Sequence, residues 1–416
     1  MSPISDPRAT DAGAPLTRSV QEIRSEFPGL EAGTVALDGA AGTLAPRAVI
    51  DAVGEAMRWS MANLHGAFAA SRRSTETVAG ARRAIADLLG GSPDGVVLGP
   101  NMTTLTFHLA DALSAGWGPG DEVVVTSLDH DANIRPWVIA AQRAGATVRW
   151  AEFDVPTGEL PASVFDALIT DRTRLVAVTA ASNAIGTKPE VRAISERAHA
   201  AGALTYVDGV HATSHGPIDV AGLGADFYAC STYKLFGPHL GTVIADPRLL
   251  ESLRPAKLAP APEAVPARFE RGTPAFELLA GARAAVDWLA ELTDTSGPRP
   301  ARLRAALAAI ERHLDALLEQ ALAGLAGIPG VRMLGAPRRR TSTISFLVAG
   351  HTPQDVARQL AARGIAVWAG DNYAYELMDR FGLRDSGGAI RASIVLYNDR
   401  GDVDRLLEAV ADVARS

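Results

Sequence analysis

Short apolar and β-branched runs alternate with amphipathic helical stretches over residues 20–275. Parallel strands need long crossover connections, usually helices, and these cover both faces of the sheet. The alternation therefore predicts an α/β fold with a seven-stranded, mostly parallel sheet. The predicted strands cover residues 96–98, 122–126, 147–151, 175–179, 204–208, 227–231 and 242–245, and the predicted helices between them cover residues 77–89, 104–113, 134–144 and 191–200.

The pattern changes after Pro274, where a long helical region begins. We predict three segments: a mobile N-terminal arm (1–19), a large domain (20–275) whose first residues can pack on the small domain, and a smaller α+β domain (276–416). The arm is rich in Pro, Ala, Ser and Asp and shows no periodicity. The predicted small-domain strands are 331–334, 343–348, 366–368 and 389–396, and its helices are 277–288, 302–325, 353–363, 374–381 and 402–413.

Composition excludes several classes of protein. The 416 residues carry a net charge of -7, so no basic surface for nucleic acid is expected. The single cysteine, Cys230, excludes an internal disulfide framework and indicates a reducing compartment. The first residues, MSPISDPRATDAGAP, lack the charged-then-apolar pattern of a signal peptide, and no apolar run reaches the ~18 residues that span a bilayer. We expect a cytoplasmic protein that binds no membrane and, because the histidines show no ligand spacing, no metal.

Two charged residues follow predicted strands of the sheet. Asp208 ends the run Leu204–Asp208, and Lys234 comes shortly after the run Phe227–Ser231. Ligands of α/β sheets collect at the carboxyl ends of strands. An amine and a carboxylate at this edge are the groups that pyridoxal phosphate (PLP) requires, one for a Schiff base and one for the pyridinium nitrogen. Taken singly, a strand-end Asp is often a cap, and such a Lys is usually a surface residue.

Residues 37–407 resemble the class V aminotransferase superfamily of PLP fold type I, and within it the cysteine desulfurase-like branch. The matching stretches are TYVDGVHATSHGPIDVAGLGADFYACSTYKLFGPHLG, RFERGTP, SLDHDANIRPW, ASNAIGT and IRASIVLYN. The resemblance implies that PLP is the cofactor and a small amino acid the substrate. It also implies a homodimer in which the subunits share their sites.

The resemblance assigns a role to individual residues. Lys234, His130 and His211 would be catalytic, with His130 stacked on the cofactor ring and Asn183 and His211 flanking its phenolate oxygen. The cofactor would also be bound by Asp208 and by the phosphate ligands Thr103, Thr104, Ser231 and Tyr233, with Gly272 and Thr273 reaching the partner's phosphate. The substrate would contact Ala40, Ala41, Asn183, Tyr373 and Arg391, the last as a clamp for its carboxylate.

The phosphate assignment has independent support. Asn101 to Thr104 follow a strand and open a helix, where free amides and the helix dipole favour an anion. For the two threonines, a simple N-cap is the alternative.

The sequence departs from the desulfurases at one position that matters for chemistry. Desulfurases need a mobile cysteine in a small-domain loop, and the matching position in GDNYA is Tyr373. Cys230 is expected to be a buried, unreactive thiol. We therefore favour β-elimination of an S-substituted cysteine, with transamination next and epimerisation third. A non-enzymatic scaffold is disfavoured because Lys234, Asp208 and Arg391 are all present.

Overall fold

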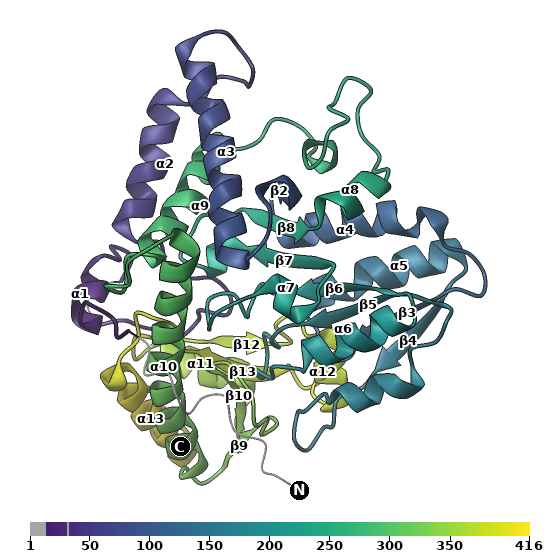
Figure 1. The fold of residues 1–416 in the computed structure, drawn as a ribbon. Helices are drawn as coiled ribbons and strands as arrows, with labels where there is room; N and C mark the ends of the chain where they lie inside the picture. The colour runs from purple at the N-terminus through teal and green to yellow at the C-terminus, as the bar shows by residue number, and fades with distance from the viewer. Residues whose placement is uncertain (1–13, 31–32) are drawn as a thin grey trace, which may run out of the picture.

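The computed structural model describes residues 14–30 and 33–416, and its largest element is a seven-stranded sheet (Figure 1). The strand order is β2-β8-β7-β6-β5-β3-β4, and β8 runs in the direction opposite to the other six strands. The predicted fold class is confirmed. The strands are β2 (Val96–Gly99), β3 (Glu122–Thr126), β4 (Thr147–Ala151), β5 (Thr173–Thr179), β6 (Leu204–Asp208), β7 (Phe227–Ser231) and β8 (Gly241–Ala245).

Alternating side chains of the sheet enter two separate cores. Val123 and Val125 of β3 belong to one core, and Val124 between them belongs to the other, as a strand with a period of two requires. Helices cover both faces, so each strand is apolar on both sides. These helices are α3 (Ala69–Leu89), α4 (Met102–Leu113), α5 (Arg135–Ala144), α6 (Val191–Ala200), α7 (Val220–Leu223) and α8 (Pro247–Ser252).

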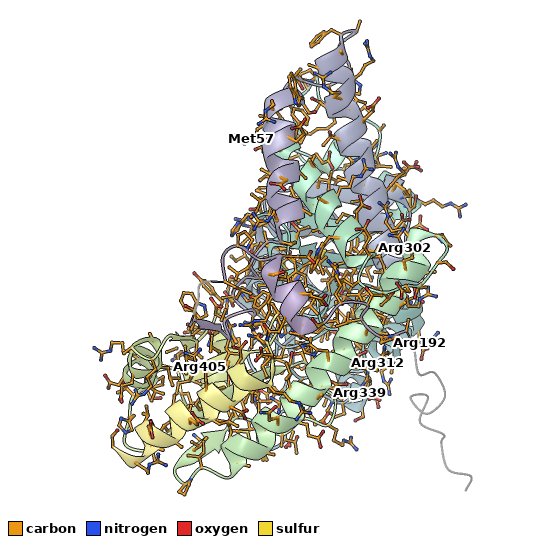
Figure 2. All side chains as sticks on the ribbon, turned by 90° about the vertical axis from the view of Figure 1, so that its left-hand side faces the viewer. Met57, Arg192, Arg302, Arg312, Arg339 and Arg405 are labelled. Carbon is orange, nitrogen blue, oxygen red and sulfur yellow. The ribbon has the colours of Figure 1, made fainter. Side chains whose placement is uncertain are left out.

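Two further helices, which rise with α3 above the sheet, are α2 (Arg47–Trp59) and α9 (Phe276–Leu289) (Figures 1 and 2). Helix α2 is not among the helices predicted from the sequence pattern. Helix α9 follows the predicted domain boundary yet packs on α2 and α3, and thus on the large domain. We therefore propose that the boundary lies later, within α10 (Arg299–Ala326). Short 3₁₀ helices complete the elements at Pro93–Gly95, Ser114–Gly116, Asp131–Asn133, Ala162–Ala167, Thr232–Lys234 and Ala267–Phe269.

The small domain is built on a four-stranded antiparallel sheet of order β12-β13-β10-β9. The predicted strand 366–368 is wrong as one element: its first part pairs with the N-terminal segment, and its last residue begins a strand of the small sheet. The elements are β9 (Val331–Met333), β10 (Thr343–Val348), β11 (Ile365–Ala366), β12 (Trp368–Gly370), β13 (Ala389–Ser393), α11 (Pro353–Ala361), α12 (Tyr375–Arg380) and α13 (Arg400–Arg415).

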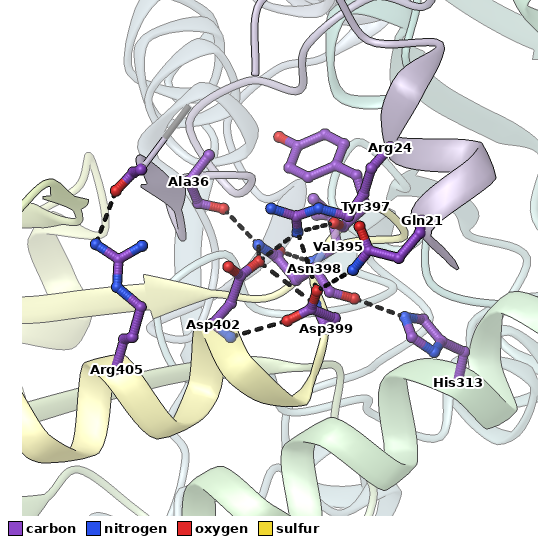
Figure 3. A network of polar contacts seen from close by, with 11 residues as sticks. Gln21, Arg24, Ala36, His313, Val395, Tyr397, Asn398, Asp399, Asp402 and Arg405 are labelled. Carbon is purple, nitrogen blue, oxygen red and sulfur yellow. Dashed lines mark hydrogen bonds and ion pairs between the residues drawn. The ribbon is translucent and has the colours of Figure 1, made fainter. Parts of the chain in front are cut away.

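The N-terminal segment is attached to the small domain, as Figure 3 shows. Strand β1 (Val35–Ala36) pairs with β11. The Arg24 guanidinium, at the end of α1 (Val20–Ser25), donates to the Tyr397 carbonyl and to Asp402, both at 2.6 Å. The Asn398 amide donates to the Ala36 carbonyl at 2.9 Å. The N-terminal segment is therefore tied to the small domain, and it also contacts the large one, where the Trp288 indole donates to Glu26 at 2.6 Å.

The predicted N-terminal arm and the membrane character of the helices can be compared with the structure. Residues 1–13 of the predicted arm lie outside the described residues, whereas the Thr17 amide already donates to the Leu292 carbonyl at 3.0 Å. Within residues 14–30 and 33–416, no helix has both the length and the apolar character to cross a membrane.

Candidate active site

Loops that follow five parallel strands converge on a cleft at the carboxyl edge of the large sheet, with about 420 Å³ of free space when open solvent is counted. The lining residues are Asn101, Met102, Thr103, His130, Ala132, Thr179, Ala181, Asn183, Asp208, Val210, His211, Ser231, Tyr233 and Lys234. Eight of the predicted site residues are among them.

Lys234 is buried in the cleft and forms no ion pair with any residue that the structure describes. The other two lysines of the sequence, Lys188 and Lys257, pair with glutamates at 2.8 and 2.7 Å. Burial and the Arg391 charge lower the pKa of Lys234 to about 8, against the opposing effect of Asp208. Its amine is therefore available in neutral, nucleophilic form near physiological pH.

Asp208 ends β6, and Lys234 follows the adjacent strand β7. One carboxylate oxygen of Asp208 accepts the Val210 amide at 2.9 Å. Burial raises the pKa of Asp208 to about 6, although the Lys234 charge lowers it. No ion pair joins these two described side chains, so both are left to bind a group between them. A ring with a carbonyl at one end and a protonated nitrogen at the other meets both requirements, and PLP has this form.

Hydrogen bonds to buried neighbours hold the His130 ring in place. Its Nδ1 accepts the Ala132 amide at 3.0 Å, which places the proton of the neutral ring on Nε2. Burial, with the Lys234 and Arg391 charges, lowers the pKa of His130 to about 3, so the ring is neutral. The preceding Asp129 accepts from the Asn133 amide at 2.6 Å and from the Thr179 backbone at 3.1 Å.

Asp129 was not predicted as part of the site. Burial raises its pKa to about 8. Its contacts fix the end of β3 against the end of β5, and thus the position of His130. The signal was present in the sequence, because an acidic residue directly precedes His130 after a strand.

Asn183 and Arg391 link the cleft to the small domain. The Arg391 guanidinium donates to the Asn183 carbonyl at 3.1 Å, and the Asn183 amide donates to the Asn372 carbonyl at 2.8 Å. The side-chain oxygen of Asn183 is buried and has no partner among the described residues. Burial lowers the pKa of Arg391 to about 10, while the Asp38 charge raises it. A buried cation with spare donors suits a carboxylate ligand.

The start of α4 presents part of an anion site. The Met102 amide donates to the Ser231 hydroxyl at 3.1 Å, and the Thr104 amide to the Asn101 side chain at 2.8 Å. No described residue accepts from the Thr103 amide between them, which remains available for a phosphate.

The structure separates Thr104 from the cleft. Thr104 lines a neighbouring hollow together with the exposed residues Gly272 and Thr273. These three residues line one hollow, and Lys234 is not among the residues that line it. The assignment of Gly272 and Thr273 to the partner's site fits this position and stays a prediction.

His211 joins the cleft to strand β10. Its Nε2 lies 2.9 Å from the Thr343 hydroxyl and 3.1 Å from the Thr341 hydroxyl. Burial lowers the pKa of His211 well below its usual value, and the neighbouring His215 contributes. His211 is therefore neutral, and its position depends on the small domain.

Three other predicted residues, Ala40, Ala41 and Tyr373, do not line the cleft but are connected to residues that do. Ala40 is buried, the Ala41 amide donates to the Asp38 carbonyl at 2.8 Å, and this turn leads to Thr43, which contacts the backbone of Tyr233. The Tyr373 ring is stacked on His130 with the centroids 5.4 Å apart. In the described residues, no group of three or more His, Cys, Asp or Glu side chains is arranged to hold a metal ion.

Comparisons with known proteins agree on one family. The family described as aminotransferase class-V matches residues 35–406. An uncharacterised protein of Mycobacterium tuberculosis is 36% identical over 400 residues, which are 96% of this chain and 100% of the relative. A probable cysteine desulfurase of Pseudomonas aeruginosa is 35% identical over 405 residues, 93% of this chain and 96% of the relative. The solved cysteine desulfurase CsdA (S-sulfonic acid) of Escherichia coli is 32% identical, with a TM-score of 0.83 and coverage of 96% and 98%.

The lowered pKa of Lys234 makes a testable prediction about the cofactor-free protein. Only the neutral amine reacts with acetic anhydride, so labelling of Lys234 should rise with pH through a midpoint near 8. Asp208→Asn should move this midpoint lower, because it removes the charge that favours the protonated amine. Mass spectrometry can follow Lys234 with Lys188 and Lys257 as internal references, and Asp166→Asn as a remote control. A midpoint near 10 would contradict the burial argument.

Proposed function

We propose that the protein is a lyase. The chain belongs to the class V aminotransferase family and is a PLP-dependent enzyme of the cysteine desulfurase type. The reaction would be β-elimination from an S-substituted cysteine, without formation of an enzyme persulfide. The amino-acid substrate fits the family and the buried Arg391 beside the cleft.

The observation that carries this proposal is the side chain beside His130. A desulfurase needs a thiol in this small-domain loop, and the loop presents Tyr373 instead. Cys230 offers no replacement: it is buried on β7, its sulfur lies 3.0 Å from the Thr242 hydroxyl, and burial raises its pKa to about 11. A protonated, buried thiol is a poor acceptor for sulfur.

Different residues of the cleft would carry out different steps of the elimination. Arg391 would hold the substrate carboxylate, and Lys234 Nζ would accept the proton from the α-carbon. Bound PLP supplies an electron sink for the charge that develops there. Asp208 would keep the proton on the cofactor's ring nitrogen. Its burial strengthens that interaction, because the local dielectric is low.

Other residues would position the cofactor. Asn183 and His211 would flank its phenolate oxygen, where the unpartnered Asn183 oxygen and the neutral His211 both fit. His130 would stack on the ring and could donate its Nε2 proton to the leaving sulfur. Thr103, Ser231 and Tyr233 would hold the phosphate.

We further propose a homodimer with shared sites. Gly272 and Thr273 are exposed and line the same hollow as Thr104, and the lining of this hollow does not include Lys234. Their predicted contact with a phosphate therefore requires a second copy. Mixing inactive Lys234→Ala with an inactive Thr273→Ala variant should restore part of the activity in hybrid dimers. No restoration, despite demonstrated subunit exchange, would contradict the shared site.

Product analysis tests the reaction type. An S-substituted L-cysteine should yield pyruvate and ammonia in equal amounts over many turnovers, and L-cysteine should leave no persulfide on the protein. Tyr373→Cys should gain a persulfide at the introduced thiol, whereas Cys230→Ser should behave like the parent protein in both assays. Peptide mass spectrometry locates any persulfide.

Three outcomes would contradict β-elimination without persulfide. A persulfide on Cys230 would make the protein a desulfurase. Accumulation of pyridoxamine phosphate without a keto acid would make it an aminotransferase. Loss of optical purity with deuterium entering the α-position from solvent, without pyruvate, ammonia or pyridoxamine phosphate, would make it an epimerase.

A further inference from the structure

The small-domain segment from β12 to α12 places two exposed aromatic rings near the cleft. Trp368 is 51% exposed and Tyr373 is 72% exposed. Figure 1 shows β12 on the side of the small sheet that faces the large domain. Exposed large apolar side chains that gather in one place often mark a binding surface.

Trp368 stands next to the proposed carboxylate clamp. In the antiparallel pair of β12 and β13, Trp368 is directly opposite Arg391. Side chains of such opposite residues project from the same face of the sheet, with their Cβ atoms about 4.5–5.5 Å apart. Since Arg391 donates to the Asn183 carbonyl at the cleft, the Trp368 side chain leaves the small sheet from the face that is directed toward the cleft.

Tyr373 is fixed by two donors from the large domain. The Asp131 amide donates to the Tyr373 carbonyl at 2.7 Å, and the Asn183 side chain donates to the Asn372 carbonyl at 2.8 Å. Both Asn372 and Tyr373 have a φ of 55°, in the left-handed region that is unfavourable for tyrosine. The two bonds stabilise this conformation and keep the Tyr373 ring stacked on His130.

Most charged side chains near these rings are paired. Arg135 binds Asp131 and Glu376, both at 2.7 Å, and Arg384 binds Asp379 at 3.0 Å, whereas Asp371 accepts the Tyr373 amide at 3.0 Å and has no ion pair among the described residues. A charged group on the substrate would lose water on contact with the rings and would compete with the existing ion pairs. An uncharged, apolar group meets no such competition and gains contact with the rings.

We propose that Trp368 and Tyr373 bind the group on the sulfur of the substrate, and that this group is aromatic or bulky and apolar. The inference rests on the proposed β-elimination and names its substrate class, the S-aryl and large S-alkyl cysteines. The Cβ–S bond breaks, the α-proton is lost and the sulfur leaves as a thiol. With one water, the remaining fragment gives pyruvate and ammonium, so no oxidant or reductant is needed.

Binding of unreactive analogues separates recognition from catalysis. The probes are 3-(phenylthio)lactate and 3-(methylthio)lactate, which carry a hydroxyl in place of the amine and cannot bond to the cofactor. Calorimetry on the PLP-loaded protein should give a dissociation constant about tenfold lower for the phenyl compound. Trp368→Ala and Tyr373→Ala should each reduce this preference roughly threefold to tenfold, with little change for the methyl compound.

A matched control and the turnover assay complete the test. Trp59→Ala removes a similarly exposed ring (53%) from α2, away from the cleft, and should keep the full preference. Equal binding of both probes, or an unchanged preference in the Trp368→Ala/Tyr373→Ala double variant, would overturn the inference. The inference would also be overturned if the double variant lost the preference only because its dimer dissociated. A preference for the phenyl probe without pyruvate from S-phenyl-L-cysteine would instead overturn β-elimination and leave the recognition intact.

Discussion

Asp208 and Lys234 are buried at the ends of adjacent parallel strands, and no ion pair joins them. Burying a charge without a partner costs free energy. Burial therefore raises the pKa of Asp208 to about 6 and lowers the pKa of Lys234 to about 8, so that both groups lose their charge more readily. The two core layers of the sheet hold β6 and β7 in place in spite of this cost. A ligand that carries a positive nitrogen to Asp208 and an electrophilic carbon to Lys234 relieves it. The other residues of the cleft surround the space in which such a ligand would bind.

The two domains meet through the same cleft. Arg391 and Asn183 connect the small sheet to the end of β5, and His211 connects β10 to the end of β6. The N-terminal segment is joined to the small domain through β1 and Arg24. Domain position and site geometry are therefore coupled. A small-domain loop held by large-domain donors, as at Tyr373, suits a fixed binding wall better than a carrier of sulfur.

The sequence alone predicts most of the large domain, since alternation identifies strands and polar residues after strands identify the sheet edge. It does not distinguish Thr103 from Thr104, because successive helical residues diverge by about 100° and only the packing of α4 decides which faces the cleft. It joins β11 and β12 into one strand, because the partner of each, β1 or β13, depends on tertiary structure. Trp368 beside Arg391 follows from strand register, which the sequence pattern does not give.

The central claim is that the chain holds its cofactor on Lys234. Borohydride reduction of the yellow protein, followed by proteolysis and peptide mass spectrometry, tests it directly. We expect a single reduced pyridoxyl group, on the peptide that contains Lys234, and none in Lys234→Ala. Label on Lys188 or Lys257, or a protein that binds no PLP, would contradict the assignment.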